Sequence, residues 1–261
     1  FCDILEPGSG EAYERDPRTT AKKAEAYVKS TGIGDTITVG PEAEFFMFDD
    51  VRFETGYDRS YYKIDDIELP TNSGREYDVG NMGHRPRAKG GYFPVAPVDS
   101  AVDIRGEMVA TMMEMGLKMD KHHHEVGAAQ HELGLTFSTL VTTADQMQVY
   151  KYVVHQVAHS YGKTATFMPK PFRDAPGSGM HTHLSLFEGD RNAFFEAGAA
   201  YQRVVAFSAH LRMHRTLAIA LLECQGAVSV VRPRVEIARV SMGEREGCGT
   251  FHYLQFFVPD S

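Results

Sequence analysis

The sequence has little of several features, and each scarcity argues against a class of protein. It has only three cysteines among 261 residues, too few and too scattered for a disulfide framework or a cysteine-bound zinc site. No stretch approaches the about eighteen uninterrupted apolar residues that a membrane span needs. Acidic residues outnumber basic ones by 35 to 27, which argues against a protein that holds nucleic-acid phosphates. We therefore expect a reducing, cytoplasmic setting, with no membrane and no nucleic acid as a partner.

The overall organisation predicts one domain of mixed structure. The length and the 43% hydrophobic content suffice for a sizeable core. No internal repeat or low-complexity linker interrupts the chain, so we predict a single domain over residues 1–261. A Rossmann-type fold is disfavoured because no G-x-G-x-x-G motif follows a strand. Strand pairs joined by long helices predict an α+β fold around a largely antiparallel sheet.

Helices are predicted from cap residues, apolar spacing and terminating glycines. Asp16 followed by Pro17 marks the start of the first helix, because the aspartate can accept hydrogen bonds from the first free amides. Gly32 marks its end, and Asp99 is predicted to cap the second helix. The predicted helices cover residues 16–32, 99–116, 142–162 and 195–223.

Strands are predicted where β-branched and aromatic residues gather between turn signals. Two of them are separated by small residues at 127–129, which is typical of a β-hairpin. Residues 51–98 are rich in Gly, Asn, Asp and Pro and predict strand fragments joined by long loops, and residues 226–261 predict mixed strand and loop. The predicted strands cover residues 35–48, 117–126, 130–140 and 163–168.

One segment, residues 168–187, has the pattern of a site. It joins a loop rich in proline and glycine to an alternating stretch in which His181, His183 and Ser185 share one face. Three polar side chains therefore converge where apolar ones normally pack. The alternative is that the two histidines are structural and hydrogen-bonded.

Carboxylates on predicted strands indicate a divalent cation. Glu42 and Glu44 share a face of the first strand, and the predicted hairpin carries Glu125 and Glu132. A carboxylate on a sheet face is costly unless it is paired or metal-bound, and Mg²⁺ or Mn²⁺ prefers such oxygens. The alternative for a single Glu-x-Glu pair is the solvated face of a half-exposed strand.

Three consecutive histidines, His122, His123 and His124, precede Glu125. Alternation along a strand sends His123 to the side opposite its neighbours, so the three cannot bind one metal together. We expect at most one of them to be functional.

Several long motifs in series resemble the catalytic domain of bacterial-type glutamine synthetases. The resemblance covers about residues 1–200 in order, and residues 201–261 diverge from the pattern. It implies an α+β fold with a curved, largely antiparallel sheet, a half-barrel, flanked by helices. The motifs are "FCDI", "GPEAEFFMFD", "GHRPRAKGGYFPVAPVDS", "HHHEV", "QHELG", "KTATFMPKP" and "GSGMHTHLSLFEGDRNAFFEAGA".

The resemblance also implies the reaction and its metals. Members of the family join ammonia to glutamate with ATP as co-substrate, through a γ-glutamyl phosphate, and use two divalent metals, Mg²⁺ or Mn²⁺, in each site. By the family pattern, one metal would be held by Glu44, Glu125 and Glu132. The other would be held by Glu42 and His181.

The remaining site residues are carried over in the same way. His183 and Ser185 would contact ATP, and Phe137 would flank the adenine. Gly177 would lie against the glutamate substrate, and Glu132 would also face that substrate.

The C-terminal part departs from the family pattern. Glu236 is the candidate for the flap glutamate that draws a proton from ammonium, and Arg232 is the candidate for binding the substrate carboxylate. Cys248 falls where the family has the arginine of "NRS", and Gln255 and Phe257 stand where it has the Glu and Arg of "EFR". These replacements remove charges that would act on the metal and the transferring phosphate.

Family architecture adds further expectations. Members carry a β-grasp domain before "FCDI" and helices after "PDS", which this sequence lacks, and they assemble as stacked six-membered rings with shared active sites. The resemblance therefore implies a homo-oligomer, provided that assembly survives without those parts. The alternatives are a ligase that joins glutamate to a polyamine or another amine, and a non-catalytic relative that binds nucleotide.

Overall fold

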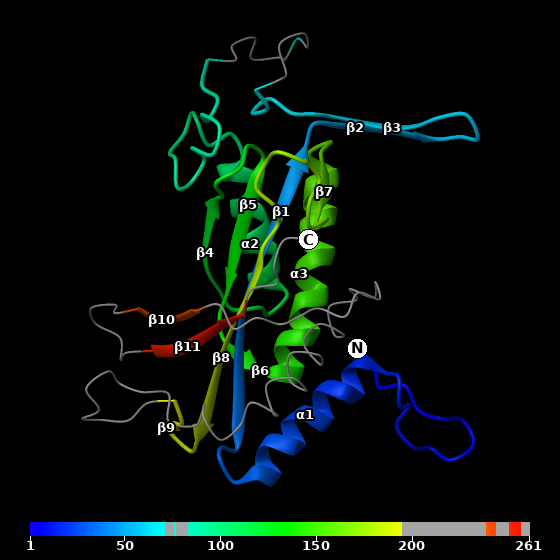
Figure 1. The fold of residues 1–261 in the computed structure, drawn as a ribbon, viewed down its shortest axis with the longest axis vertical. Helices are drawn as coiled ribbons and strands as arrows, with labels where there is room; N and C mark the ends of the chain where they lie inside the picture. Colours follow the sequence, from blue (N-terminus) through cyan, green and yellow to red (C-terminus); the bar gives the residue numbers. More distant parts are fainter. Residues whose placement is uncertain (71–75, 77–82, 195–238, 244–250, 257–261) are drawn as a thin grey trace. The chain divides into compact units, whose positions relative to one another are not determined.

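The computed structural model describes residues 1–70, 76, 83–194, 239–243 and 251–256 (Figure 1). Strand β1 (Thr36–Phe48) and helix α3 (Leu140–Ser160) each contribute residues to two compact units. Whether the chain is a single domain over residues 1–261 stays a prediction. Unit 1 comprises Phe1–Pro41, Phe137–Gln148 and His181–Ser261, and unit 2 comprises Glu42–Thr136 and Val149–Met180.

The described residues of unit 1 form one complete helix and several antiparallel strand pairs. The start of β1 pairs with β6, and β8 pairs with both β9 and β11. Strand β10 pairs with β11, which agrees with the strand and loop predicted for the tail. Its elements besides β1 and α3 are α1 (Pro17–Thr31), β6 (Ser138–Thr139), β8 (Met180–Glu188), β9 (Arg191–Asn192), β10 (Arg239–Gly243) and β11 (Phe251–Phe256).

Helix α1 begins and ends as its sequence predicts. The Asp16 side chain accepts hydrogen bonds from the backbone amides of Arg18 and Thr19, and Pro17 occupies the first turn. Gly32 ends the helix with φ of 70°, a left-handed conformation that glycine adopts without strain.

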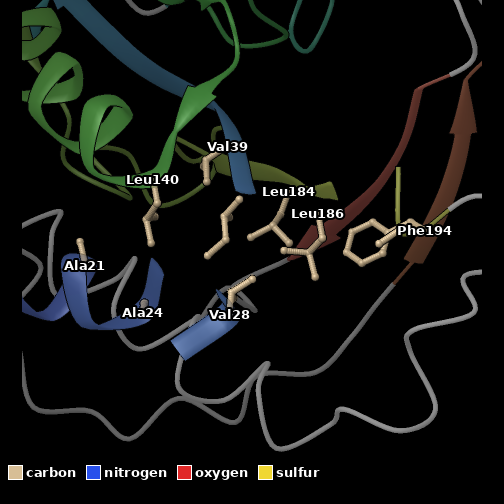
Figure 2. Close-up of a cluster of buried hydrophobic side chains, with 10 residues drawn as sticks. Ala21, Ala24, Val28, Val39, Leu140, Leu184, Leu186 and Phe194 are labelled. Carbon is tan, nitrogen blue, oxygen red and sulfur yellow. The ribbon is translucent and has the colours of Figure 1, made fainter. Parts of the chain in front are cut away.

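The buried face of α1 packs in an apolar cluster of unit 1 (Figure 2). Leu184 and Leu186 of β8 belong to the same cluster, so alternate residues of that strand pack in the core. The intervening residues, including His183 and Ser185, therefore point away from this cluster. The cluster consists of Ala21, Ala24, Val28, Ile37, Val39, Leu140, Leu184, Leu186, Ala193 and Phe194.

Unit 2 is built around antiparallel strands that confirm the predicted α+β class. Strand β5 pairs with both β4 and the end of β1, and β1 also pairs with β7. The predicted hairpin is the β4–β5 pair (Figure 1). Its elements besides β1 and α3 are β2 (Asp50–Thr55), β3 (Ser60–Asp65), α2 (Val102–Glu114), β4 (Met119–His124), β5 (Gln130–Leu135) and β7 (Thr164–Thr166).

Two predicted helix starts are wrong. Helix α2 begins at Val102 with no side-chain cap, and the Asp99 carboxylate instead binds the Arg105 guanidinium, with Nη1 to Oδ1 at 2.9 Å. Helix α3 begins at Leu140 rather than at the predicted residue 142, and the Thr143 hydroxyl donates to the Val39 carbonyl at 3.2 Å.

Two further predictions concern the C-terminal part and a membrane span. The helix predicted at 195–223 lies outside the described residues, as does most of the tail. Among the helices that the structure describes, none combines the length and apolar character needed to cross a bilayer.

Candidate functional site

Three side chains of residue types that can bind a metal ion converge on one face of the β4–β5 hairpin. His123 lies opposite Glu132 in the strand register, and Glu125 follows directly after β4. Imidazole and carboxylate atoms of the three residues all lie within 4.8 Å of one another, and all three side chains are buried. The His123 ring lies between the acids, with Nδ1 3.5 Å from Glu125 Oε1 and Nε2 3.5 Å from Glu132 Oε1. We call His123, Glu125 and Glu132 the front cluster.

The electrostatics of the front cluster favour a bound cation. Burial by itself would lower the pKa of His123, but Glu132 and Glu125 more than offset this and raise it. Burial raises the pKa of Tyr92, and the nearby negative charge of Glu125 and Glu132 raises it further. Two buried carboxylates that share one imidazole are costly without more positive charge. Their oxygen and nitrogen donors suit Mg²⁺ or Mn²⁺, with imidazole tolerated better by Mn²⁺.

Aromatic rings form a wall beside this cluster. The Phe93 ring stacks on His123 with centroids 4.4 Å apart, and Tyr92 meets His123 edge-on at 5.8 Å. The backbone comes this close because residue 91 is glycine, since a Cβ there would lie 2.5 Å from the Glu125 carbonyl oxygen. The Gly91 amide donates to the Val126 carbonyl at 3.1 Å, which attaches the wall to the hairpin.

Gln130 connects two of the predicted site residues. Its Nε2 donates to Glu44 Oε2 and to the Gly177 carbonyl, both at 2.7 Å. The Gly179 amide also donates to Glu44 Oε2, at 2.9 Å, and Glu44 lies opposite Glu132 in the strand register. A side chain at Gly177 would collide with the Pro169 carbonyl oxygen, 2.7 Å from the Cβ position. The glycine-rich loop is thus held against the end of β1.

Unit 1 brings together the residues predicted to bind nucleotide. His183 and Ser185 are buried on β8, and His181 is half-buried. The exposed Phe137 ring meets the His183 ring at a centroid distance of 6.5 Å. Gly40 leaves room for Phe137, because a Cβ at Gly40 would lie 2.8 Å from that ring.

The predicted site residues therefore fall into separate groups. The division of metal ligands into two sites, including the pairing of Glu42 with His181, stays a prediction. Gln255, at the position of the "EFR" glutamate, lies opposite His183 in the register of β11 and β8. Unit 2 contains Glu42, Glu44, Glu125, Glu132 and Gly177; unit 1 contains Phe137, His181, His183 and Ser185; Arg232 and Glu236 lie outside the described residues.

Sequence reasoning did not assign a role to His123 or Gln130. Alternation separated His123 from its neighbours, but only the register of the hairpin shows that it faces Glu132. No sequence signal marks Gln130, because its contacts with Glu44 and Gly177 are 86 and 47 residues away along the chain.

Known proteins show clear similarity to this chain. Residues 14–212 match the family described as "Glutamine synthetase, catalytic domain". The glutamine synthetases of Rhizobium meliloti and Bradyrhizobium diazoefficiens are 62% and 60% identical over 201 and 200 residues, each match covering 77% of this chain and 42% of the relative. A cryo-EM structure of Plasmodium falciparum glutamine synthetase matches with a TM-score of 0.68 and 33% identity, covering 75% of this chain and 38% of that one. The likeness confirms the predicted fold, and the chain spans about 42% of the length of the curated relatives.

Proposed function

Because the chain belongs to the glutamine synthetase catalytic-domain family, we propose that it serves the ATP-dependent ligation of ammonia to glutamate. The reaction passes through a γ-glutamyl phosphate and yields glutamine, ADP and phosphate. The observation that carries the proposal is the front cluster, in which His123, Glu125 and Glu132 converge within a chain that matches the family over residues 14–212.

Divalent cations are part of this proposal. Family membership implies the use of ATP and divalent metal, and we propose Mg²⁺ or Mn²⁺, with two ions in each site. Glu125 and Glu132, with Glu44 opposite Glu132, would hold one ion, and Glu42 is assigned to the other. When bound, such ions neutralise charge on the transferring phosphate oxygens.

Other side chains of the protein hold the proposed metal ligands and the substrate-binding loop in position. Gln130 donates hydrogen bonds to the Glu44 carboxylate and to the Gly177 carbonyl. It therefore fixes the distance between the proposed metal ligand Glu44 and the proposed glutamate-binding loop. Tyr92 and Phe93 shield one side of His123 from water. Because these groups are already held in position, the carboxylates and their surroundings need little reorganisation during the reaction.

Nucleotide and the remaining substrate contacts complete the proposal. His183 and Ser185 contact ATP, with Phe137 against the adenine, an arrangement supported by the contact between the Phe137 and His183 rings. Arg232 binds the glutamate carboxylate, and Glu236 takes a proton from ammonium. The protein acts in the cytoplasm as a homo-oligomer of the ring-forming type.

Incubation of the chain with glutamate, ammonia, ATP and Mg²⁺ tests the proposal directly. We expect release of ADP together with glutamine, and loss of both in the Glu125→Ala variant. Other amines in place of ammonia should give no product. No ADP release above that of Glu125→Ala would overturn the proposed reaction for this chain.

A further inference from the structure

Glu68 lies on the opposite side of the hairpin from the front cluster and accepts hydrogen bonds from three parts of unit 2. The loop residue Glu68 is only 3% exposed. Its Oε2 accepts from His124 Nε2 and from the Ala129 amide, both at 2.7 Å, and its Oε1 accepts from the Ser100 hydroxyl at 2.6 Å. These donors belong to the end of β4, the hairpin turn and the segment before α2. One buried carboxylate thus ties the turn to the rest of the unit.

His124 carries the connection to the backbone of Glu125. Its Nε2 contacts Glu68, and its Nδ1 lies 2.6 Å from the Glu125 carbonyl oxygen. The ring therefore joins the Glu68 carboxylate to the backbone of Glu125. The carbonyl that it holds belongs to the residue whose carboxylate lies in the front cluster.

Ala129 carries the connection to the other end of the turn. Its φ of 61° lies in the left-handed region, which is unfavourable for a residue with a Cβ. The hydrogen bond from its amide to Glu68 holds this conformation, and the Ala129 side chain packs with Phe46 and Phe48. Immediately afterwards, the Gln130 carbonyl accepts from the Glu125 amide at 2.7 Å, which closes the turn.

We propose that Glu68 is a positioning residue that fixes both ends of the 125–130 turn, so that the Glu125 carboxylate stays beside His123 and Glu132 for a shared divalent cation. Glu68 acts through His124 at one end and Ala129 at the other, with no contact of its own to that cation. The inference rests on the metal site of the proposed function and assigns its geometry to a residue outside the front cluster.

Mn²⁺ binding to the full chain, followed by electron paramagnetic resonance of the free ion, tests this role. Glu68→Ala removes the acceptor for both ends of the turn, and we expect the affinity for Mn²⁺ to fall about 10- to 100-fold, as for other residues that orient metal ligands. Glu68→Gln keeps an oxygen that can accept from His124 and Ala129, so it should restore part of the affinity. Val154→Ala, a truncation of a fully buried side chain in α3, is the control for lost stability and should leave the affinity unchanged.

Hydrogen exchange gives a second readout that does not depend on a bound ion. The Ala129 and Glu125 amides should exchange faster in Glu68→Ala than in Val154→Ala under conditions in which both variants are folded. Equal exchange in the two variants would overturn the positioning role.

The binding outcomes separate the two proposals. If the unaltered chain and Glu68→Ala bind Mn²⁺ equally, the positioning role is overturned while the metal site stands. If Mn²⁺ affinity depends on Glu68 but no glutamine forms, the proposed reaction is overturned while the positioning role stands. If the unaltered chain binds no Mn²⁺, both the metal site and the role of Glu68 in it are overturned.

Discussion

The two sides of the β4–β5 hairpin differ in how their buried charges are paired. On the front, Glu125 and Glu132 share the single imidazole of His123. On the back, Glu68 is paired with His124, and Asp99 is paired with Arg105. We call the back group of Glu68, His124, Asp99, Arg105 and His131 the back network.

The pKa values reflect the same difference. Burial would raise the pKa of Glu68, but the hydrogen bond and charge of His124, together with smaller contributions that include the Ser100 hydrogen bond, outweigh it and lower the value to about 2. His131 is the neutral member, because burial and then the Arg105 charge hold its pKa well below the usual range, and Arg105 Nη1 lies 3.0 Å from its Nδ1. Charges on the back are balanced by protein groups, whereas those on the front suit an added cation. We therefore expect the back network to stabilise the fold and the front cluster to bind a cation.

The largest effect should come from removing a front carboxylate. Glu125→Gln and Glu132→Gln should each abolish measurable Mn²⁺ binding, because the remaining donors lose a charged ligand. The free energy of unfolding without metal should stay the same or rise, since like charges are relieved. Calorimetric titration and urea unfolding measure the two properties. A large loss of stability in either variant would contradict a binding role for the front cluster.

Breaking the back network should have the opposite outcome. Arg105→Met leaves Asp99 buried without its cation and should lower the free energy of unfolding by about 3–5 kcal/mol. Urea unfolding measures this loss. Arg18→Met, which breaks the partly exposed pair with Asp145, is the control and should cost much less. Equal losses in the two variants would remove the distinction between the back network and an ordinary surface pair.

Gly91→Ala should perturb both sides of the hairpin by a smaller amount. The added Cβ would lie 2.5 Å from the Glu125 carbonyl oxygen and 2.8 Å from the His124 ring, so the hairpin must shift. We expect a loss of about 1–3 kcal/mol in unfolding free energy, together with weaker Mn²⁺ binding.

Gly106→Ala is the matched control for this substitution. Gly106 lies inside α2 with nothing within 4 Å of its Cβ position, so alanine should stabilise the helix by about 0.5–1 kcal/mol. Thermal unfolding of both variants separates a steric collision from a general effect of replacing glycine. If Gly91→Ala left the free energy of unfolding unchanged, close packing of residue 91 against the hairpin would be contradicted.

A further predicted effect is a change in pH dependence at Asp66. Burial raises the pKa of Asp66 to about 7, Lys163 at 3.5 Å opposes the rise, and Asp49 and Glu68 add to it. The folded chain therefore keeps this proton after the unfolded chain has lost it, so the contribution of Asp66 to stability is lost as pH rises from about 4 to 7. The advantage of Asp66→Asn over the unaltered chain should grow across this range and then level off. Urea unfolding at several pH values checks it, and a constant difference would contradict the assignment.

Local signals predicted the parts of the fold that depend on neighbouring residues. Asp16, Pro17 and Gly32 mark the ends of α1 because caps act within one turn, and the small residues at 127–129 mark the hairpin for the same reason. Glu125 and Glu132 were assigned to the site through their positions on that hairpin.

Long-range contacts account for what the sequence could not predict. Asp99 has the residue type of a helix cap, but its carboxylate binds Arg105 and so leaves α2 without one. Which of three consecutive histidines faces the acids depends on the pairing of β4 with β5. Gln130 joins Glu44 to Gly177 only after β1, β5 and the glycine-rich loop have come together. In each case the partner is set by tertiary structure rather than by local pattern.

Anomalous scattering from crystals of the chain soaked in Mn²⁺ tests the central claim most directly, because it locates the ion. The account predicts a peak within bonding distance of the Glu125 and Glu132 carboxylates, on the side of the hairpin that carries His123. The peak should be absent in Glu125→Gln. Crystals that show no peak there, or the same peak in Glu125→Gln, would contradict the assignment of the front cluster as a cation site.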